Sequence, residues 1–163
     1  MNISLTKRLF ILFFVGFTSL FASVARSEND AERKTGGDRL LGVWEPSNGR
    51  ARVKIEKIGV KYYGKIVWLK EPNDPETGVP KTDKNNPDPT LQKAPLKGYR
   101  MLKDFVYQEK SEWSEGTIYD PLNGSSYSCT IKMTDPNTLE IRGYIGVSAF
   151  GRTDVWKRLV VKK

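Results

Sequence analysis

The chain has 163 residues, a length typical of one domain, and a formal net charge of +8. It contains no histidine, which excludes Ser-His-Asp and Cys-His catalysis, histidine metal ligands and a histidine pH switch. Its single cysteine, Cys129, excludes an internal disulfide. Because Cys129 lies in the alternating stretch YSCTIKM, we interpret it as a small buried apolar residue rather than a reactive thiol.

The first residues have the features of a secretory signal peptide. Lys7 and Arg8 form a basic start, an apolar run extends to Phe21, and small residues follow up to Ala25. A membrane-spanning anchor is the alternative, but the apolar run is too short for it, and no stable membrane insertion is expected. We predict cleavage after Ala25 or Ser27 and a periplasmic or secreted protein. Cleavage after Ala25 lowers the net charge from +8 to +6.

The sequence predicts three consecutive parts. Residues 1–25 are the predicted signal peptide, and the polar residues 26–39 form a flexible lead-in. Residues 40–163 are long enough to bury a hydrophobic core of their own, and we predict one folded domain there.

Alternation of apolar and polar residues predicts short strands in this domain. Residues 42–68 are expected to form three strands joined by turns. The middle strand has an apolar residue at every other position and cationic residues between them, so one of its faces is apolar and the other is cationic. Tight turns are expected at Asn48-Gly49 and at Ile58-Gly59. The third strand is expected to place three residues on one face: Gly64, Ile66 and Trp68.

Five further strands are expected after a long break. Their expected ranges are 103–108, 113–119, 126–134, 139–145 and 154–161. Sequential antiparallel strands of this number remove their open edges by closing, so we predict an all-β fold, an antiparallel up-and-down β-barrel of about eight strands. A β-sandwich is the alternative, and connection by hairpins alone disfavours it.

A proline-rich segment separates the third and fourth strands. Residues 71–97 hold six of the nine prolines, so no strand or helix of useful length is expected there. Both ends of this loop should lie on the rim opposite Trp44, where it is either a lid over an open mouth or an excursion along the barrel side. Residues 83–88 lack the glycine and the distal glutamate of a calcium loop, and no metal site is predicted.

Several motifs resemble known families. Gly42 and Trp44, taken with Arg158 on the last strand, resemble the lipocalin and calycin signature. The stretches GVWEPSNGRARVKIE, APLKGYRML and W-x-x-G-x-I-Y-D-P-x-N-G-x-x-Y, with the closing W-K-R, resemble an exported bacterial family, domain of unknown function 2147. The resemblance implies a periplasmic, lipocalin-like barrel and supplies no catalytic residues. In such a barrel the Trp44 indole plugs one end and the Arg158 guanidinium stacks across it.

The first of three candidate functions is the binding of a small apolar ligand, such as a fatty acid or similar lipid, inside the barrel. For the same interior residues, the alternative is a filled core without a cavity. The residues expected to form the interior wall are Val53, Ile55, Ile66, Trp68, Tyr127, Cys129, Ile131 and Ile141.

The other two candidates need no cavity. An envelope interaction protein with a filled barrel would bind anionic lipid or cell-wall polymer through a basic outer face. The residues of that face are Arg50, Arg52, Lys54, Lys65, Lys132 and Arg142. An enzyme is not predicted, because no pair of carboxylates has a defined spacing across a substrate. Export disfavours nucleic-acid binding, no cofactor is expected, and the ligand's identity and the oligomeric state stay open.

Overall fold

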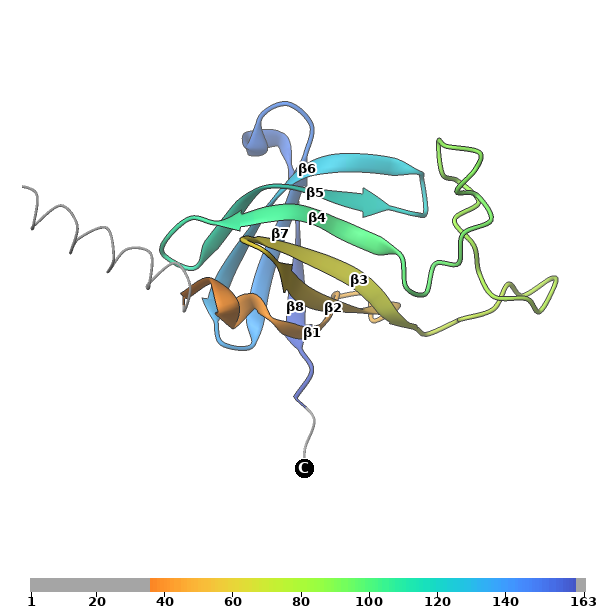
Figure 1. The fold of residues 1–163 in the computed structure, drawn as a ribbon, viewed down its shortest axis with the longest axis horizontal. Helices are drawn as coiled ribbons and strands as arrows, with labels where there is room; N and C mark the ends of the chain where they lie inside the picture. Colours follow the sequence, from red (N-terminus) through yellow and green to blue (C-terminus); the bar gives the residue numbers. More distant parts are fainter. Residues whose placement is uncertain (1–35, 161–163) are drawn as a thin grey trace, which may run out of the picture.

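Residues 36–160 are described by a computed structural model, and the predicted signal peptide and most of the lead-in lie outside the described residues. The strands are β1 (Gly42–Glu45), β2 (Ala51–Ile58), β3 (Lys61–Leu69), β4 (Arg100–Tyr107), β5 (Glu112–Asp120), β6 (Ser125–Asp135), β7 (Thr138–Tyr144) and β8 (Arg152–Arg158). These strands form one closed barrel in sequence order (Figure 1). The prediction of an up-and-down antiparallel barrel is confirmed.

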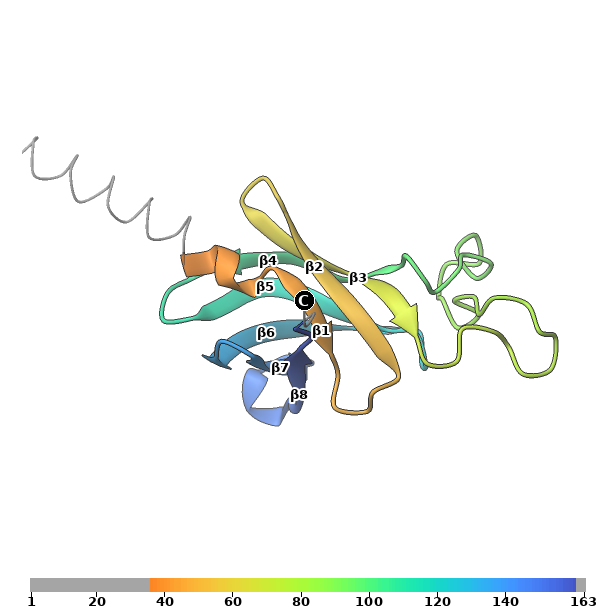
Figure 2. The same cartoon turned by 90° about the horizontal axis from the view of Figure 1, so that it is seen from below.

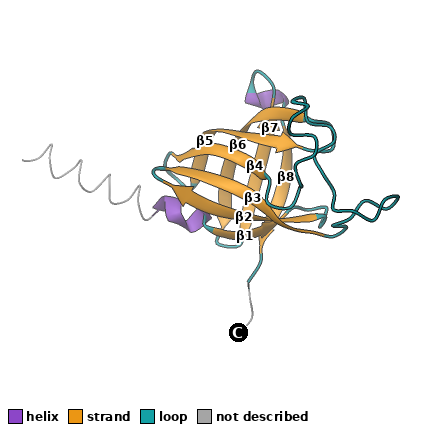
Figure 3. Ribbon diagram, turned by 45° about the vertical axis from the view of Figure 1, so that its right-hand side comes forward, coloured by secondary structure: helices purple, strands orange, loops and turns teal. Residues whose placement is uncertain are grey.

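Short connections follow from this strand order, because antiparallel neighbours can be joined by tight turns. The barrel closes where β1 meets β8, with Trp44 opposite Arg158 and Glu45 opposite Lys157. A backbone hydrogen bond, donated by Leu159 N to Val43 O at 2.9 Å, continues this pairing past the end of β8. Besides the strands and the loops, the described residues form two short 3-10 helices, η1 (Asp38–Leu40) and η2 (Ser148–Phe150) (Figure 3).

The two ends of the barrel differ in what covers them. We call the end with η1 and the β2–β3, β4–β5 and β6–β7 turns the closed end, and the opposite end the mouth. The long β3–β4 loop, residues 70–99, extends beyond the mouth, on the far side of the barrel from η1 in two perpendicular views (Figures 1 and 2). Within this loop the only β-pairing is two isolated bridges, Asn73 with Pro80 and Thr82 with Pro95.

Trp44 and Arg158 lie together at the closed end. The guanidinium carbon of Arg158 is 4.1 Å from the centroid of the Trp44 ring, and the indole Nε1 donates to Leu40 O at 2.9 Å. Arg158 Nη1 donates to Leu41 O at 2.7 Å. A β-carbon at Gly42, whose φ is +136°, would lie 2.6 Å from that same nitrogen. The glycine therefore gives Arg158 the space to reach the carbonyl.

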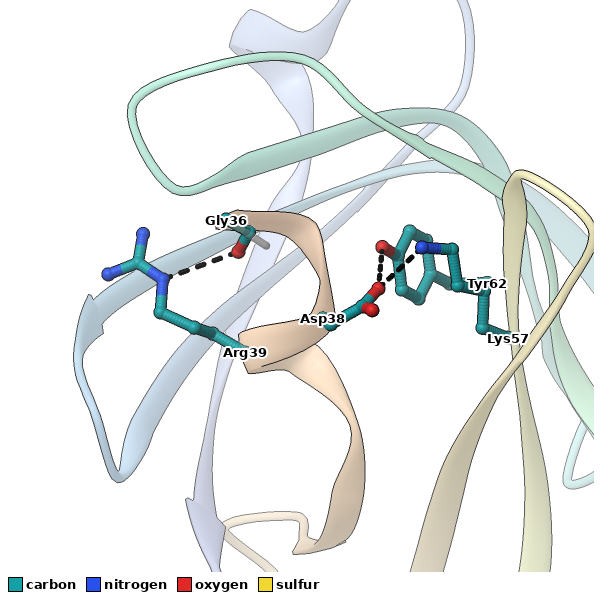
Figure 4. Close-up of polar contacts among 5 residues, drawn as sticks. All are labelled: Gly36, Asp38, Arg39, Lys57 and Tyr62. Atoms are coloured by element: carbon teal, nitrogen blue, oxygen red, sulfur yellow. Dashed lines mark hydrogen bonds and ion pairs between the residues drawn. The ribbon is translucent and has the colours of Figure 1, made fainter. Parts of the chain in front are cut away.

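The packed structure begins before Leu40. The flexible lead-in is predicted to extend to residue 39, but residues 36–39 already belong to the packed domain. Gly37 is buried, and a side chain there would collide with the Tyr62 hydroxyl. Asp38 Oδ1 accepts hydrogen bonds from the Tyr62 hydroxyl at 2.7 Å and from Lys57 Nζ at 2.6 Å (Figure 4). Burial and this carboxylate raise the pKa of Tyr62, so its hydroxyl stays a donor. Residues 36–39 therefore help to close this end.

Trp68 is a predicted interior residue that lies outside the barrel. Arg52 pairs with Trp68, but the next residue of β2 pairs with Ile66, so Val67 is an extra residue in β3. Such a β-bulge reverses the alternation, and Leu69 takes the inward position instead. Trp68 is 36% exposed, and the guanidinium carbon of Arg52 lies 4.3 Å from its ring centroid on the outer face. The prediction for Trp68 was therefore wrong.

Candidate ligand site at the barrel mouth

The closed-end half of the interior is a packed core. One contiguous cluster of buried side chains has members from all eight strands, among them Trp44, Trp113, Trp156 and Phe105. It also contains five of the residues predicted as a ligand wall, each at most 2% exposed: Val53, Ile55, Cys129, Ile131 and Ile141. Since these residues pack against one another and against the aromatic side chains, they contribute to a filled core.

Cys129 lies inside this core. The side chain is 1% exposed, and burial raises the pKa of its thiol to about 12. A thiol with this pKa is protonated at neutral pH, and the thiol form is neither a good nucleophile nor a metal ligand. Its position agrees with the small apolar role expected from the alternation of the sequence.

Ile66 and Tyr127 lie toward the mouth ends of β3 and β6, next to the core: Ile66 pairs with the core residue Val53. Ile66 is 2% exposed but is not a member of the packed cluster. Tyr127 is half-buried and pairs with Ile118, which in turn pairs with the buried Leu102, so both face inward. The Tyr127 hydroxyl accepts a hydrogen bond from Asn123 Nδ2 at 3.0 Å, which ties the ring to the β5–β6 turn.

Strand register identifies two further inward residues, because directly opposed residues in a sheet share a face. In the rows nearest the closed end, the β6 and β7 members are buried core residues, so the β8 member of each row must also face inward. The rows, from the closed end to the mouth, are Met133, Leu139 and Trp156; Ile131, Ile141 and Asp154; and Cys129, Gly143 and Arg152. Asp154 and Arg152 therefore point toward the interior at the mouth.

These two charged residues have different surroundings. Asp154 is half-buried, and its Oδ2 accepts a hydrogen bond from Trp156 Nε1 at 2.8 Å. That bond satisfies an indole donor at the top of the packed core. The Arg152 side chain is exposed, and its guanidinium has no hydrogen bond or ion pair with any residue in the range 36–160.

Ile118 and Tyr127 pack over Gly143 on the inner face beside Arg152. A β-carbon built at Gly143 would lie 3.4 Å from Ile118 Cγ2 and 3.7 Å from Tyr127 Cβ, both ordinary contact distances. A larger side chain at this position would have to displace Ile118 and Tyr127. The mouth therefore combines an apolar inner surface, from Ile66, Ile118 and Tyr127, with three inward charged residues. These are Arg152, Asp154 and, two residues after Ile118, Asp120.

Comparison with known proteins gives the family of this chain and agrees with its barrel fold. The sequence matches the family described as an uncharacterized protein conserved in bacteria, DUF2147, over residues 42–158. The chain belongs to the DUF2147 family. Among solved structures it is similar to HP1028 from the human pathogen Helicobacter pylori, a protein described as belonging to the lipocalin family. The two chains are 24% identical with a TM-score of 0.66, over 75% of this chain and 84% of the other, which shows a shared fold. No curated protein matched the sequence.

In this DUF2147 chain the proline-rich loop is anchored at the mouth by a buried carboxylate. Asp83 is fully buried, and its two oxygens accept hydrogen bonds from the Tyr119 hydroxyl at 2.7 Å and from Asn86 Nδ2 at 2.6 Å. Burial, followed by the Asp83 charge, raises the pKa of Tyr119, so this phenol remains a donor. Asn85 Nδ2 donates to the carbonyls of Pro121 and Leu122 at 3.1 and 2.9 Å. These bonds fix the middle of the loop to the β5–β6 hairpin.

The predicted basic outer face is largely neutralised by its neighbours. Arg52 pairs with Glu45, Lys54 and Lys65 both pair with Glu56, and all these nitrogen-to-oxygen distances are between 2.9 and 3.1 Å. The two cations on the far side of the barrel are also engaged: Lys132 lies 3.6 Å from Glu112, and Arg142 donates to Ser148 O, Ala149 O and Thr153 Oγ1. Of the six predicted cations, only Arg50 has no such side-chain partner among the described residues.

Two absences apply to residues 36–160 alone. No cluster of three or more carboxylate or thiol side chains there could hold a metal ion. No helix of this part has the length and apolarity needed to cross a membrane.

The sequence reasoning missed Asp154, Arg152 and Asp83. A signal for the first two is present in the last strand, because Trp156 and Arg158 mark the inward positions and every second residue before them shares that face. The apolar Val155, which is 40% exposed, occupies an outward position and obscures this pattern. For Asp83 the sequence carries no comparable signal, since its partner Tyr119 is distant in the chain.

Proposed function

We propose that this protein is a non-enzymatic binding protein that takes up one small apolar molecule at the mouth of its barrel. The observation that carries the proposal is the inner surface of the mouth, where the paired residues Ile118 and Tyr127 face inward next to Gly143. Ile66 adds a buried apolar side chain outside the packed cluster. Apolar surfaces of this kind, with a few polar groups at the edge, are typical of small-molecule sites.

The packed core limits where the ligand can lie. Side chains from all eight strands fill the closed-end half, with Trp156 in that cluster. Opening a cavity there would require the removal of close-packed side chains, at a cost of several kcal/mol. The ligand is therefore small and occupies the mouth half. Barrels of about eight strands can hold one small ligand in this way, and the likeness to a lipocalin-family structure supports such a role.

We place this binding in the cell envelope. Lys7, Arg8 and the apolar run after them support export and removal of the first 25 or 27 residues. Mass spectrometry of the envelope fraction should show a mature amino terminus at Arg26 or at Glu28. A protein that keeps Met1 in the inner membrane would contradict export.

The experiment is a titration of the purified protein with N-phenylnaphthylamine, a neutral apolar dye whose fluorescence increases in dry surroundings. We expect saturable binding of one dye per protein and its displacement by octanol. The urea-unfolded protein is the control, because it keeps the composition but loses the mouth. A dye signal that rises linearly without saturation would contradict the proposed function.

A further inference from the structure

We infer that the mouth selects apolar molecules with a carboxylate head group, and that Arg152 binds this head group. The inference rests on the proposed function and adds the chemical class of the ligand. Arg152 pairs with Gly143, which pairs with the buried Cys129, so the register points its side chain into the mouth. Among the described residues its exposed guanidinium has no partner, so its N–H donors are available to a ligand.

A carboxylate matches the chemistry of a free guanidinium. Arginine presents N–H donors in a planar fork, which fits the two oxygens of a carboxylate and forms charge-assisted hydrogen bonds. The head group would lie at the rim, in contact with water, while the tail faces Ile118 and Tyr127. This arrangement needs no buried charge, which makes it less costly than an ion held in the core.

Other charges at the mouth favour an anion over a cation. Arg50 and Lys70 lie together at the rim, joined by the bond from Lys70 N to Arg50 O at 2.9 Å. The nearby carboxylate of Glu71 is paired with Lys81 at 3.0 Å, and its pKa is lowered by Lys81 first and by Arg50 and Lys70 as well. The electrostatic potential is therefore positive at the part of the rim that carries Arg50 and Lys70, because the carboxylate next to them, Glu71, is neutralised by Lys81.

Two carboxylates oppose this preference. Asp120 follows the inward Ile118 by two residues at the end of β5, and its Oδ1 accepts a hydrogen bond from Leu122 N at 2.9 Å. Asp154 is an inward carboxylate two residues from Arg152. One of its oxygens is held by Trp156 Nε1 at 2.8 Å, so the carboxylate is fixed below the rim. It repels a bound anion and competes with it for the guanidinium. If a cationic ligand were the natural one, this carboxylate would be its partner, and that alternative can be tested directly.

The depth of the mouth limits the length of the tail. Cys129 lies in the same row as Arg152, and Ile131 and Ile141 lie in the next row; all three belong to the packed core. A tail that starts at Arg152 therefore meets core side chains within about one row, roughly 7 Å along a strand, and has to lie across the mouth toward Ile118 and Tyr127. The geometry therefore fits a short or compact apolar acid, such as octanoate, better than a long-chain fatty acid.

The test is calorimetric titration of the purified protein with octanoate, octanol and octylamine. Octanoate should bind at least tenfold more tightly than octanol. Arg152→Gln should weaken octanoate binding by about tenfold to a hundredfold, the loss typical of one charged hydrogen-bonding partner, and leave octanol unchanged. Arg50→Gln is the matched control, because it removes the same charge from an outward position at the same end. It should change octanoate binding by less than about threefold.

Two further titrations sharpen the result. Asp154→Asn keeps an acceptor for Trp156 Nε1 but removes a negative charge, so it should tighten octanoate binding several-fold. Laurate should bind no more tightly than octanoate. Equal binding of octanoate and octanol, equal effects of Arg152→Gln and Arg50→Gln, or preference for octylamine would each overturn the inference while leaving the proposed function intact. Failure of every probe, the neutral dye included, would overturn the proposed function as well.

Discussion

At the scale of single residues, Arg158 contributes most visibly to closing the barrel. Its guanidinium stacks on Trp44 and donates to three backbone carbonyls, those of Pro136, Leu41 and Arg39, at 2.8, 2.7 and 2.6 Å. Those carbonyls belong to η1, to its continuation into β1 and to the β6–β7 turn. One side chain thus connects the start of the domain to the last strand and to a distant turn.

This geometry predicts energetic coupling between Trp44 and Arg158. Trp44→Leu removes the ring with its indole donor to Leu40, and Arg158→Gln removes the cation, so each variant abolishes the stack and should lower the free energy of unfolding by about 1–5 kcal/mol. Because the stack is lost only once, a double-mutant cycle measured by urea unfolding should give a coupling of about 0.5–2 kcal/mol. Simple additivity of the two losses would show that the stack carries no energy of its own.

The sequence could predict Trp44 and Arg158 as a pair, because both are parts of a known signature. It could not predict Asp154 and Arg152 as mouth residues from the analysis of apolar positions alone. Charged residues at inward positions do not follow the apolar alternation, and they became visible only through their partners Ile141 and Gly143 in the register.

At the scale of elements, the β3–β4 loop is more firmly placed than its composition suggests. Six prolines restrict its backbone, but the anchoring comes from side chains that join residues 36 positions apart, Asp83 and Tyr119. The loop's middle therefore cannot swing as a free flap unless this buried contact breaks.

Asp83→Ala should release this loop without unfolding the barrel. The substitution leaves the Tyr119 hydroxyl and Asn86 Nδ2 without their acceptor, a loss of about 1–3 kcal/mol for a buried donor. Limited trypsin digestion should then cut at Lys81, Lys84 or Lys93 several-fold faster than in the unchanged protein.

The control for this digestion is Asp88→Ala. Asp88 is an exposed carboxylate of the same loop that accepts only from Thr90 within it, so its loss should affect cleavage little. Equal cleavage rates for the two variants would show that the Asp83 contact does not hold the loop.

Most strands could be predicted because two signals coincide: alternation within the strand and clear turn residues at its ends. The bulge at Val67 could not be predicted, because an extra residue in a strand leaves no mark in composition. Its effect was the outward position of Trp68. The loop could be predicted as a segment without strands, but its tertiary contacts could not.

At the scale of the whole molecule, the sequence left open whether the barrel is hollow or filled. Alternation identifies inward residues but gives no information on how side chains from different strands meet across the interior. In the structure, a contiguous core fills the closed-end half of the barrel. The inward residues near the mouth lie partly outside this core. The central claim is that this mouth is a ligand site.

The most direct test is to fill the mouth with a side chain. Gly143→Leu places an isobutyl group beside Ile118 and Tyr127. Ser128→Leu is the control, because it adds the same group to the outer face of β6, opposite Tyr144. Ser128→Leu should keep the barrel's thermal unfolding within a few degrees, whereas Gly143→Leu should lower its stability by an overpacking cost of about 1–3 kcal/mol and leave the barrel folded at the titration temperature. If the mouth is the site, Gly143→Leu should weaken N-phenylnaphthylamine binding at least tenfold while Ser128→Leu leaves it unchanged; unaltered dye binding in Gly143→Leu would contradict the account.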